Sequence, residues 1–186
     1  DISLQLIALA RAGRRVLRLK GGDPYMFGRG GEEAGALAAA GVPFRIVPGI
    51  SSGIGGLAYA GIPVTHRDTN QAVIFLTGHD ETGAVPHGVN WPAVAGAAPV
   101  IVMFMAVKHL GSIAEKLLAA GRAGDERLAI VSHAATPRQS VIETTLAEAA
   151  SLINVPTPAI VVLGPVSQYR ASLDWYVEEM RGHIFG

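Results

Sequence analysis

The sixteen residues from Arg18 to Glu33 combine charged side chains and glycines in a pattern that suits an anionic ligand. The segment reads Arg-Leu-Lys-Gly-Gly-Asp-Pro-Tyr-Met-Phe-Gly-Arg-Gly-Gly-Glu-Glu. Its glycines would let a ligand approach the main chain closely. Arg29 stands between two glycines, and its guanidinium offers the planar fork that pairs with a carboxylate. We therefore predict a ligand-binding turn. The alternative is an ordinary glycine-rich connection in an α/β protein.

The neighbouring residues predict the elements that position this turn. Residues 15–19 look like a short strand, and the alanine-rich residues 32–40 are typical of a helix that ends at Gly41. Glu32 follows Arg29 by three residues. It would orient that arginine or contact an N–H of the ligand, or it would only be an acid favoured at a helix start by the helix dipole.

Along the whole chain, short β-rich runs alternate with helical ones, which indicates an α/β fold. The strands are continuous apolar runs more than alternating ones, as expected when helices cover both faces of a sheet. We predict strands over residues 15–19, 44–47, 72–77, 100–105, 128–131 and 159–163. We predict helices over residues 2–12, 32–40, 51–60, 109–120, 146–153 and 168–180.

A polar run over residues 65–71 separates two apolar regions, so we place a lobe boundary after Asp68. The predicted lobes are residues 1–68 and 69–186, each a sheet flanked by helices. A cleft between two lobes is a common place for a small-molecule site. Residues 79–92 lack periodicity and read as a long loop.

Composition excludes several classes of protein. Apolar residues make up 49% of the 186, enough for a buried core, and 15 basic against 15 acidic side chains give no reason to expect nucleic acid or a membrane as partner. The absence of cysteine excludes disulfides and thiolate metal sites and fits the cytoplasm. The longest apolar run, residues 99–107, is far shorter than the roughly 20 residues of a membrane span. The histidines lack the spacing of a zinc site, and we expect no metal.

Three segments together resemble a known family. Arg18–Glu33 is the first, Val-Pro-Gly-Ile-Ser-Ser at residues 47–52 is the second, and Ala-Gly-Ile-Pro-Val-Thr-His-Arg at residues 60–67 is the third. They resemble the uroporphyrinogen III C-methyltransferases of the tetrapyrrole methylase family, which use S-adenosylmethionine. The second segment departs from the family, which usually has threonine-alanine in place of Ser51-Ser52. The resemblance runs from about residue 13 to about residue 166.

The resemblance implies a two-lobed homodimeric enzyme that methylates rings A and B of uroporphyrinogen III to precorrin-2, in sirohaem and cobalamin biosynthesis. S-adenosylhomocysteine would be the second product, with no metal required. The substrate carries eight carboxylates, so an uncharged chain must aim a few cations at it. Arg18, Lys20 and His66 are candidates, and Arg29 and Arg67 lie in the family's substrate-contacting motifs. The implied substrate-binding residues are Arg29, Glu32, Arg67 and Met105, with Arg29 and Glu32 also acting in catalysis.

For the cofactor, the resemblance implies residues that all lie just past the ends of predicted strands, where open α/β sheets bind ligands. Asp23 would pair with the methionine ammonium, and Met26 and Met105 would provide apolar walls, whereas without the resemblance these methionines read as core residues. Residues 132–136 read Ser-His-Ala-Ala-Thr, where the family often has asparagine-glycine-threonine. The implied cofactor-binding residues are Gly21, Gly22, Asp23, Met26, Ser51, Ser52, Met105 and Ala134.

The chain starts at Asp1 inside a helical pattern. We therefore expect a missing N-terminal segment, which the resemblance implies to hold a first strand, a Gly-x-Gly-Pro-Gly-Asp loop and proton-transfer residues. Two alternatives stay open. One is a non-catalytic domain that binds a tetrapyrrole or S-adenosylmethionine, and the other is a methyltransferase for a later corrin intermediate.

Overall fold

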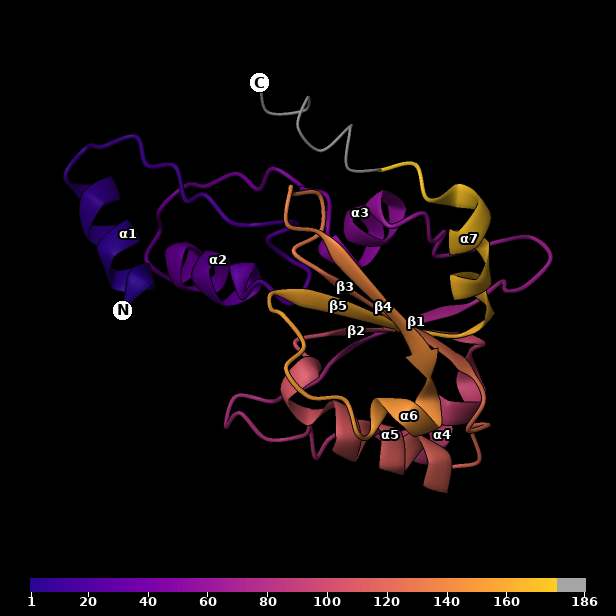
Figure 1. The fold of residues 1–186 in the computed structure, drawn as a ribbon. Coiled ribbons are helices and arrows are strands. Elements are labelled where there is room, and N and C mark those ends of the chain that lie inside the picture. The colour runs from indigo at the N-terminus through magenta and orange to yellow at the C-terminus, as the bar shows by residue number, and fades with distance from the viewer. Residues whose placement is uncertain (177–186) are drawn as a thin grey trace. The chain divides into compact units, whose positions relative to one another are not determined.

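The computed structural model describes residues 1–176, and the contacts among them divide the chain into two compact units. Unit 1 is Asp1–Ser51 and unit 2 begins at Ser52. Unit 1 contains the helices α1 (Ile2–Arg11) and α2 (Gly30–Ala39), which contact each other (Figure 1). The Asp1 side chain caps α1 by accepting a hydrogen bond from the Ser3 N–H, at 2.8 Å.

The two strands predicted in unit 1, at residues 15–19 and 44–47, are not formed within residues 1–51. Their apolar side chains are exposed, with Leu17 at 84% and Val47 at 79%. A strand exists only where its N–H and C=O groups pair with a neighbouring strand. Because neither segment has such a neighbour in unit 1, the prediction of a sheet in each lobe is wrong for these residues.

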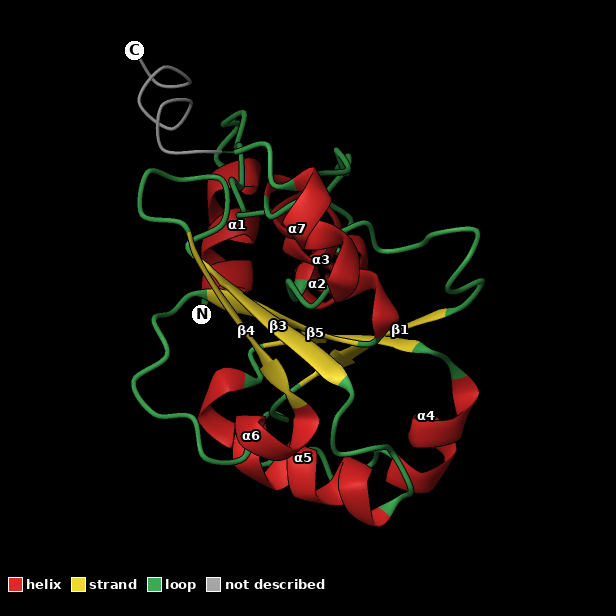
Figure 2. Cartoon of the chain, turned by 45° about the vertical axis from the view of Figure 1, so that its right-hand side comes forward, coloured by secondary structure: helices red, strands yellow, loops and turns green. Residues whose placement is uncertain are grey.

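Unit 2 holds a mixed sheet, which confirms the α/β class (Figure 2). The order of its strands is β1-β2-β5-β3-β4. β1 and β2 are parallel, whereas β5 is antiparallel to both β2 and β3, and β4 is antiparallel to β3. The carboxyl ends of β1, β2 and β3 therefore lie at one edge of the sheet. The strands are β1 (Val73–Thr77), β2 (Val100–Phe104), β3 (Arg127–Ser132), β4 (Ser140–Thr145) and β5 (Ala159–Leu163).

Helices cover both faces of this sheet, as the continuous apolar strands predict (Figures 1 and 2). One face carries α4 (Trp91–Ala97), α5 (Leu110–Ala119) and α6 (Leu146–Ala149). The other carries α3 (Ser52–Tyr59) and α7 (Arg170–Leu173). Two short 3₁₀ helices, η1 (Val107–His109) and η2 (Pro165–Tyr169), precede α5 and α7. The core under α4 to α6 includes Ile101, Met103, Ile113, Leu117, Leu128, Ile130 and Leu163.

Several elements differ from the prediction. β4 was not predicted, and α4 lies where the predicted loop ends, capped by the Asn90 side chain and with Pro92 in its first turn. The predicted helix 168–180 is shorter, since the chain is extended at Asp174, and residues 177–180 lie outside the described residues. The division between the units falls after Ser51 because α3 packs on β2 and β5. The lobe boundary after Asp68 stays a prediction. Among residues 1–176, no helix combines the length and the apolar character that crossing a membrane requires.

Candidate functional site

In unit 1, the turn at residues 21–26 is held by the carboxylate of Asp23. One carboxylate oxygen accepts the N–H of Tyr25 at 2.8 Å, and the other accepts the N–H of Gly49 at 3.0 Å. A Cβ at Gly49 would lie 2.2 Å from the carbonyl oxygen of Gly22, whose φ is +82°. Asp23 thus joins two of the segments that carry the resemblance. Its carboxylate supports the main chain of both, in addition to any contact with a ligand.

The glycines of this turn have different roles. A Cβ at Gly28 or Gly30 would lie 2.8 Å or 2.4 Å from the carbonyl oxygen of Pro24, and the Gly30 N–H donates to that oxygen at 2.9 Å. These two glycines let the loop close on itself. At Gly21, in contrast, an added Cβ would have no neighbouring atom within 4 Å. Room for a ligand beside the main chain therefore lies at Gly21.

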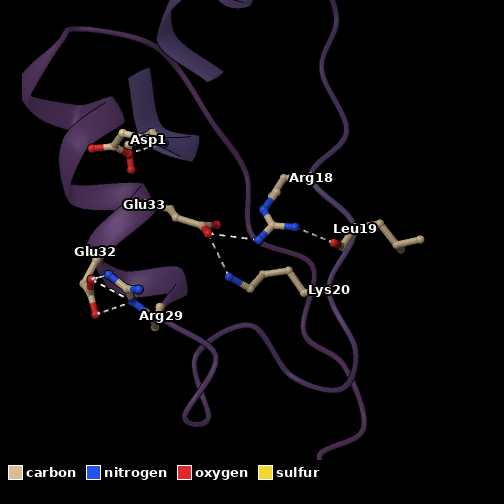
Figure 3. A network of polar contacts seen from close by, with 8 residues as sticks. Asp1, Arg18, Leu19, Lys20, Arg29, Glu32 and Glu33 are labelled. Atoms are coloured by element: carbon tan, nitrogen blue, oxygen red, sulfur yellow. Dashed lines mark hydrogen bonds and ion pairs between the residues drawn. The ribbon is translucent and has the colours of Figure 1, made fainter. Parts of the chain in front are cut away.

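Arg29 and Glu32 form a bidentate ion pair at the start of α2 (Figure 3). The Arg29 Nη2 and Nε donate to Glu32 Oε2 at 2.6 Å and 3.1 Å. Arg29 is in the left-handed region, with φ of 58°, and its side chain is 80% exposed. The hydrogen bond between them raises the pKa of Arg29 and lowers the pKa of Glu32. Glu32 therefore keeps one edge of the guanidinium oriented while the rest faces solvent.

The two other cations of this segment share one acidic partner, Glu33 (Figure 3). The Lys20 Nζ and an Arg18 Nη2 donate to Glu33 Oε1 at 3.0 Å and 3.2 Å. Burial opposes ionisation of Glu33, but the hydrogen bonds from Lys20 and Arg18 bring its pKa below the ordinary value. A hollow of about 560 Å³ in unit 1 is bordered by Asp1, Ile2, Ser3, Arg18, Leu19, Lys20, Gly21, Gly28, Arg29, Glu32 and Glu33.

Glu33→Gln is expected to lower the melting temperature of the protein near pH 7. The difference in melting temperature between the variant and wild type should shrink as the pH falls. The folded-state pKa of Glu33 is lowered, so its stabilisation is present above the ordinary glutamate pKa of about 4.3 and is lost as the pH falls through the folded value. Thermal unfolding at a series of pH values measures this, with Glu115→Gln as the control at an exposed position. A difference that does not change with pH would contradict the prediction.

In unit 2, Met105 and Ala134 follow β2 and β3 at the same edge of the sheet. β5 separates these strands, so their ends are roughly 10 Å apart. Met105 has φ of 53°, and the residues on either side of Ala134, His133 and Ala135, have φ of 48° and 60°. These values lie in the left-handed region, where a residue other than glycine is strained. Residues with such strained backbones are concentrated at ligand sites. Half-exposed Met105 and the left-handed backbones of Met105, His133 and Ala135 make this edge a candidate ligand surface.

Helix α3 brings Ser52 towards the same edge. A Cβ at Gly56 would lie 3.1 Å from the Ala134 Cβ and 3.8 Å from the Ser52 Cβ, so the face of α3 that carries Ser52 and Gly56 packs against the loop that follows β3. A Cβ at Gly53 would lie 2.6 Å from the Phe104 ring, at the end of β2. The structure thus gathers the predicted residues Ser52, Met105 and Ala134 in unit 2. Gly21, Gly22, Asp23, Met26 and Ser51 lie in unit 1.

Ser51 has a buried hydroxyl that lacks a hydrogen-bond partner within residues 1–176. Most buried polar atoms have a partner, so an unpaired one needs an explanation, such as a bound molecule. Among the same described residues, no group of three or more histidines and acids is arranged to hold a metal ion.

Arg67 lies at the tip of a turn in unit 2, with its side chain exposed. The Thr69 N–H donates to the His66 carbonyl at 3.0 Å, closing the turn around Arg67. In the part of the chain that the structure describes, no acid lies within ion-pair distance of Arg67. It is thus available to an external carboxylate.

Gln139 is a residue of this region that sequence reasoning did not identify. It is buried; its Oε1 accepts the Ala135 N–H at 2.8 Å and its Nε2 donates to the Tyr59 carbonyl at 3.0 Å. It therefore ties the loop containing Ala134 to the end of α3. A lone glutamine in a polar run carries no sequence signal for that role, because Tyr59, which it ties to the loop, lies 80 residues away along the chain.

Comparison with known proteins identifies the family of this chain. The model of the family described as Tetrapyrrole (Corrin/Porphyrin) Methylases matches residues 1–150. A uroporphyrinogen-III C-methyltransferase from Sinorhizobium sp is 62% identical over 178 residues, covering 94% of this chain and 64% of that protein. A siroheme synthase from Pseudomonas fluorescens (strain Pf0-1) is 44% identical, covering 99% of this chain and 40% of that protein. The chain thus spans less than two thirds of the length of either relative.

A crystal structure of uroporphyrin-III C-methyl transferase from Thermus thermophilus, complexed with S-adenyl homocysteine, has the same fold. Its TM-score is 0.80 at 38% identity, over 90% of this chain and 73% of that chain. The family model covers well over half of the residues, including every segment on which the resemblance was based. This chain therefore belongs to the tetrapyrrole methylase family.

Proposed function

We propose that the complete protein transfers methyl groups from S-adenosylmethionine to rings A and B of uroporphyrinogen III, forming precorrin-2 for sirohaem and cobalamin biosynthesis. The observation that carries the proposal is the 62% identity to a uroporphyrinogen-III C-methyltransferase over 94% of this chain. The 44% identity to a siroheme synthase supports the same pathway. The fold shared with a structure complexed with S-adenyl homocysteine supports the cofactor.

The residues present fit S-adenosylmethionine. In unit 1 the Ser51 hydroxyl is buried without a described partner, and the space beside Gly21 is open. In unit 2 Met105 offers a polarisable side chain at the sheet edge. When bound, the cofactor supplies an electrophilic methyl group on a sulfonium. We propose that it is held by Gly21, Gly22, Asp23, Met26, Ser51, Ser52, Met105 and Ala134.

The substrate carbon is itself the nucleophile, so the protein's main task is to hold it in line with the methyl group and to exclude water. In this proposal Arg29 and Arg67 bind substrate carboxylates, and Met105 contacts the ring system. Glu32 orients Arg29 through the bidentate pair and accepts a hydrogen bond from a pyrrole N–H. None of these residues forms a covalent bond to the substrate.

We further propose a cytoplasmic homodimer that uses no metal and has neither nucleic acid nor membrane as partner. Support for dimerisation comes from large apolar side chains left exposed, including Ile2, Leu4, Phe44 and Ile50 in unit 1 and Ile153 in unit 2. Sedimentation of the full-length protein at micromolar concentration is expected to show a dimer. A monomer throughout would rule the dimer out. Cell fractionation tests the location, and activity after chelator treatment tests the absence of a metal.

The activity is tested with the full-length protein, uroporphyrinogen III and S-adenosylmethionine under anaerobic conditions. We expect mass spectrometry to find a product with two added methyl groups and calorimetry to detect binding of S-adenosylhomocysteine. Binding without methyl transfer would favour a non-catalytic domain. Transfer only to a later corrin intermediate would favour the other alternative.

A further inference from the structure

We propose that Tyr169 is a positioning residue for Arg67. Its hydroxyl holds the His66 side chain, and His66 organises the turn that presents Arg67. The inference rests on the proposed function in one respect, namely that Arg67 binds a substrate carboxylate. All the residues involved lie in unit 2.

The backbone of His66 is the centre of this turn. Its carbonyl accepts the N–H groups of both Thr69 and Asn70 at 3.0 Å, and its own N–H donates to the Asn70 side chain at 2.9 Å. Asn70 is buried, and its Nδ2 donates to the Val64 carbonyl at 3.0 Å. The base of the turn is therefore fixed, while Arg67 lies at its exposed tip.

The imidazole of His66 is fixed from a second direction. The Asp68 N–H donates to His66 Nδ1 at 3.2 Å, so Nδ1 is an acceptor and the proton of the neutral ring is on Nε2. The Tyr169 hydroxyl, 2.9 Å from the same Nδ1, must then donate as well. The two rings also stack, with centroids 4.0 Å apart. The Asp68 carboxylate, 3.8 Å from Nδ1, is the other titratable group facing the ring.

Tyr169 can position His66 because it is itself held firmly. It ends η2, where the Ser167 hydroxyl donates to the Gly164 carbonyl at 3.0 Å. The next residue, Arg170, donates to Glu143 of β4 at 3.0 Å and to Asp174 at 2.6 Å. These contacts connect Tyr169 to the sheet, 103 residues along the chain from His66.

Arg67 depends on this support because no described acid orients its side chain. The direction of its side chain therefore follows from the backbone of the turn. When a turn is more mobile, more conformational entropy is lost on binding, and the bound ligand is held less tightly. Removing the Tyr169 hydroxyl should thus weaken carboxylate binding without affecting the cofactor.

The test uses Tyr169→Phe, Arg67→Ala and the double variant in the full-length protein. Fluorescence titration gives the Kd for uroporphyrin III, the stable oxidised form that keeps all the carboxylates, and calorimetry gives the Kd for S-adenosylhomocysteine. We expect Tyr169→Phe to weaken porphyrin binding by roughly three- to tenfold, the effect of one hydrogen bond, with the S-adenosylhomocysteine Kd unchanged. In the Arg67→Ala background the same change should have no further effect.

Tyr59→Phe is the matched control, because the Tyr59 hydroxyl has no hydrogen-bond partner among residues 1–176. The ¹⁵N shift of His66 Nδ1 gives a second readout, and we expect Tyr169→Phe to move it. The inference is overturned if Tyr169→Phe binds porphyrin as wild type does, or weakens it equally with and without Arg67. Arg67→Ala that binds porphyrin normally would overturn both the inference and the proposed role of Arg67. Wild type that binds porphyrin through Arg67 but forms no methylated product would contradict only the proposed function.

Discussion

Arg29→Lys is expected to lower kcat/KM for uroporphyrinogen III. The decrease should correspond to a loss of about 1–3 kcal/mol of transition-state stabilisation, whereas the affinity for S-adenosylhomocysteine should stay nearly unchanged. Arg29 uses Nε and Nη2 to hold Glu32. Its remaining N–H groups can meet a carboxylate at the same time, in the fixed fork that a carboxylate matches. Lysine keeps the charge but cannot make both bidentate contacts. Steady-state kinetics and calorimetry on one preparation measure the two effects separately.

Arg45→Lys is the control for this substitution, because Arg45 is an exposed arginine of unit 1 with no side-chain partner among the described residues. It should retain full activity. The left-handed backbone of Arg29 is equally costly for lysine, so strain does not distinguish the variant from wild type. If Arg29→Lys keeps full activity, or loses substrate and cofactor binding together, Arg29 is a surface or structural residue. The substrate site should then be sought around Arg67.

Gly49→Ala is expected to weaken S-adenosylhomocysteine binding by at least tenfold, on the order of 1.4 kcal/mol or more. The added Cβ would lie 2.2 Å from the Gly22 carbonyl oxygen and 3.2 Å from the Asp23 nitrogen, and both are backbone atoms that cannot rotate away. The chain must therefore shift, and the hydrogen bond from the Gly49 N–H to Asp23 is lost. That shift displaces the turn that we propose to bind the cofactor. Calorimetric titration measures the affinity.

Gly35→Ala is the matched glycine control. Gly35 lies inside α2 with no atom within 4 Å of an added Cβ, so alanine should leave cofactor affinity unchanged and stabilise the helix by roughly 0.5–1 kcal/mol. Thermal unfolding of both variants separates a local change from general unfolding. A folded Gly49→Ala protein with wild-type cofactor affinity would show that the loop at residues 47–50 is not part of the cofactor site.

Local signals in the sequence were enough to predict most of unit 2 and both helices of unit 1. β2, β3 and β5 are apolar runs bounded by turn residues, and most of their apolar side chains are buried in the structure. α5 has apolar residues at helical spacing, and the buried residues of the helix follow that spacing. The family followed in the same way from three short segments. Each of these motifs is a short contiguous segment, so it can be recognised from the sequence without knowledge of the structure.

The pairing of strands could not be predicted in this way. Residues 15–19 and 44–47 have strand composition, yet they remain unpaired within unit 1, whereas β4 was missed although it forms a full ladder with β3. Strand propensity describes how well a side chain suits a pleated surface. Whether a strand forms depends on a partner elsewhere in the chain.

The same limit applies to the candidate site. The sequence by itself pointed to Arg29, Glu32 and Arg67 as candidates, and it left the role of Glu32 open; the structure pairs Glu32 with Arg29. Only the tertiary structure decided that Glu33 engages Arg18 and Lys20, that Asp23 holds the main chain of Gly49, and that Tyr169 reaches His66 from 103 residues away. A side chain's type sets which partners it can accept. Which partner it meets depends on non-local packing, because groups brought together by the fold have no fixed separation in the sequence.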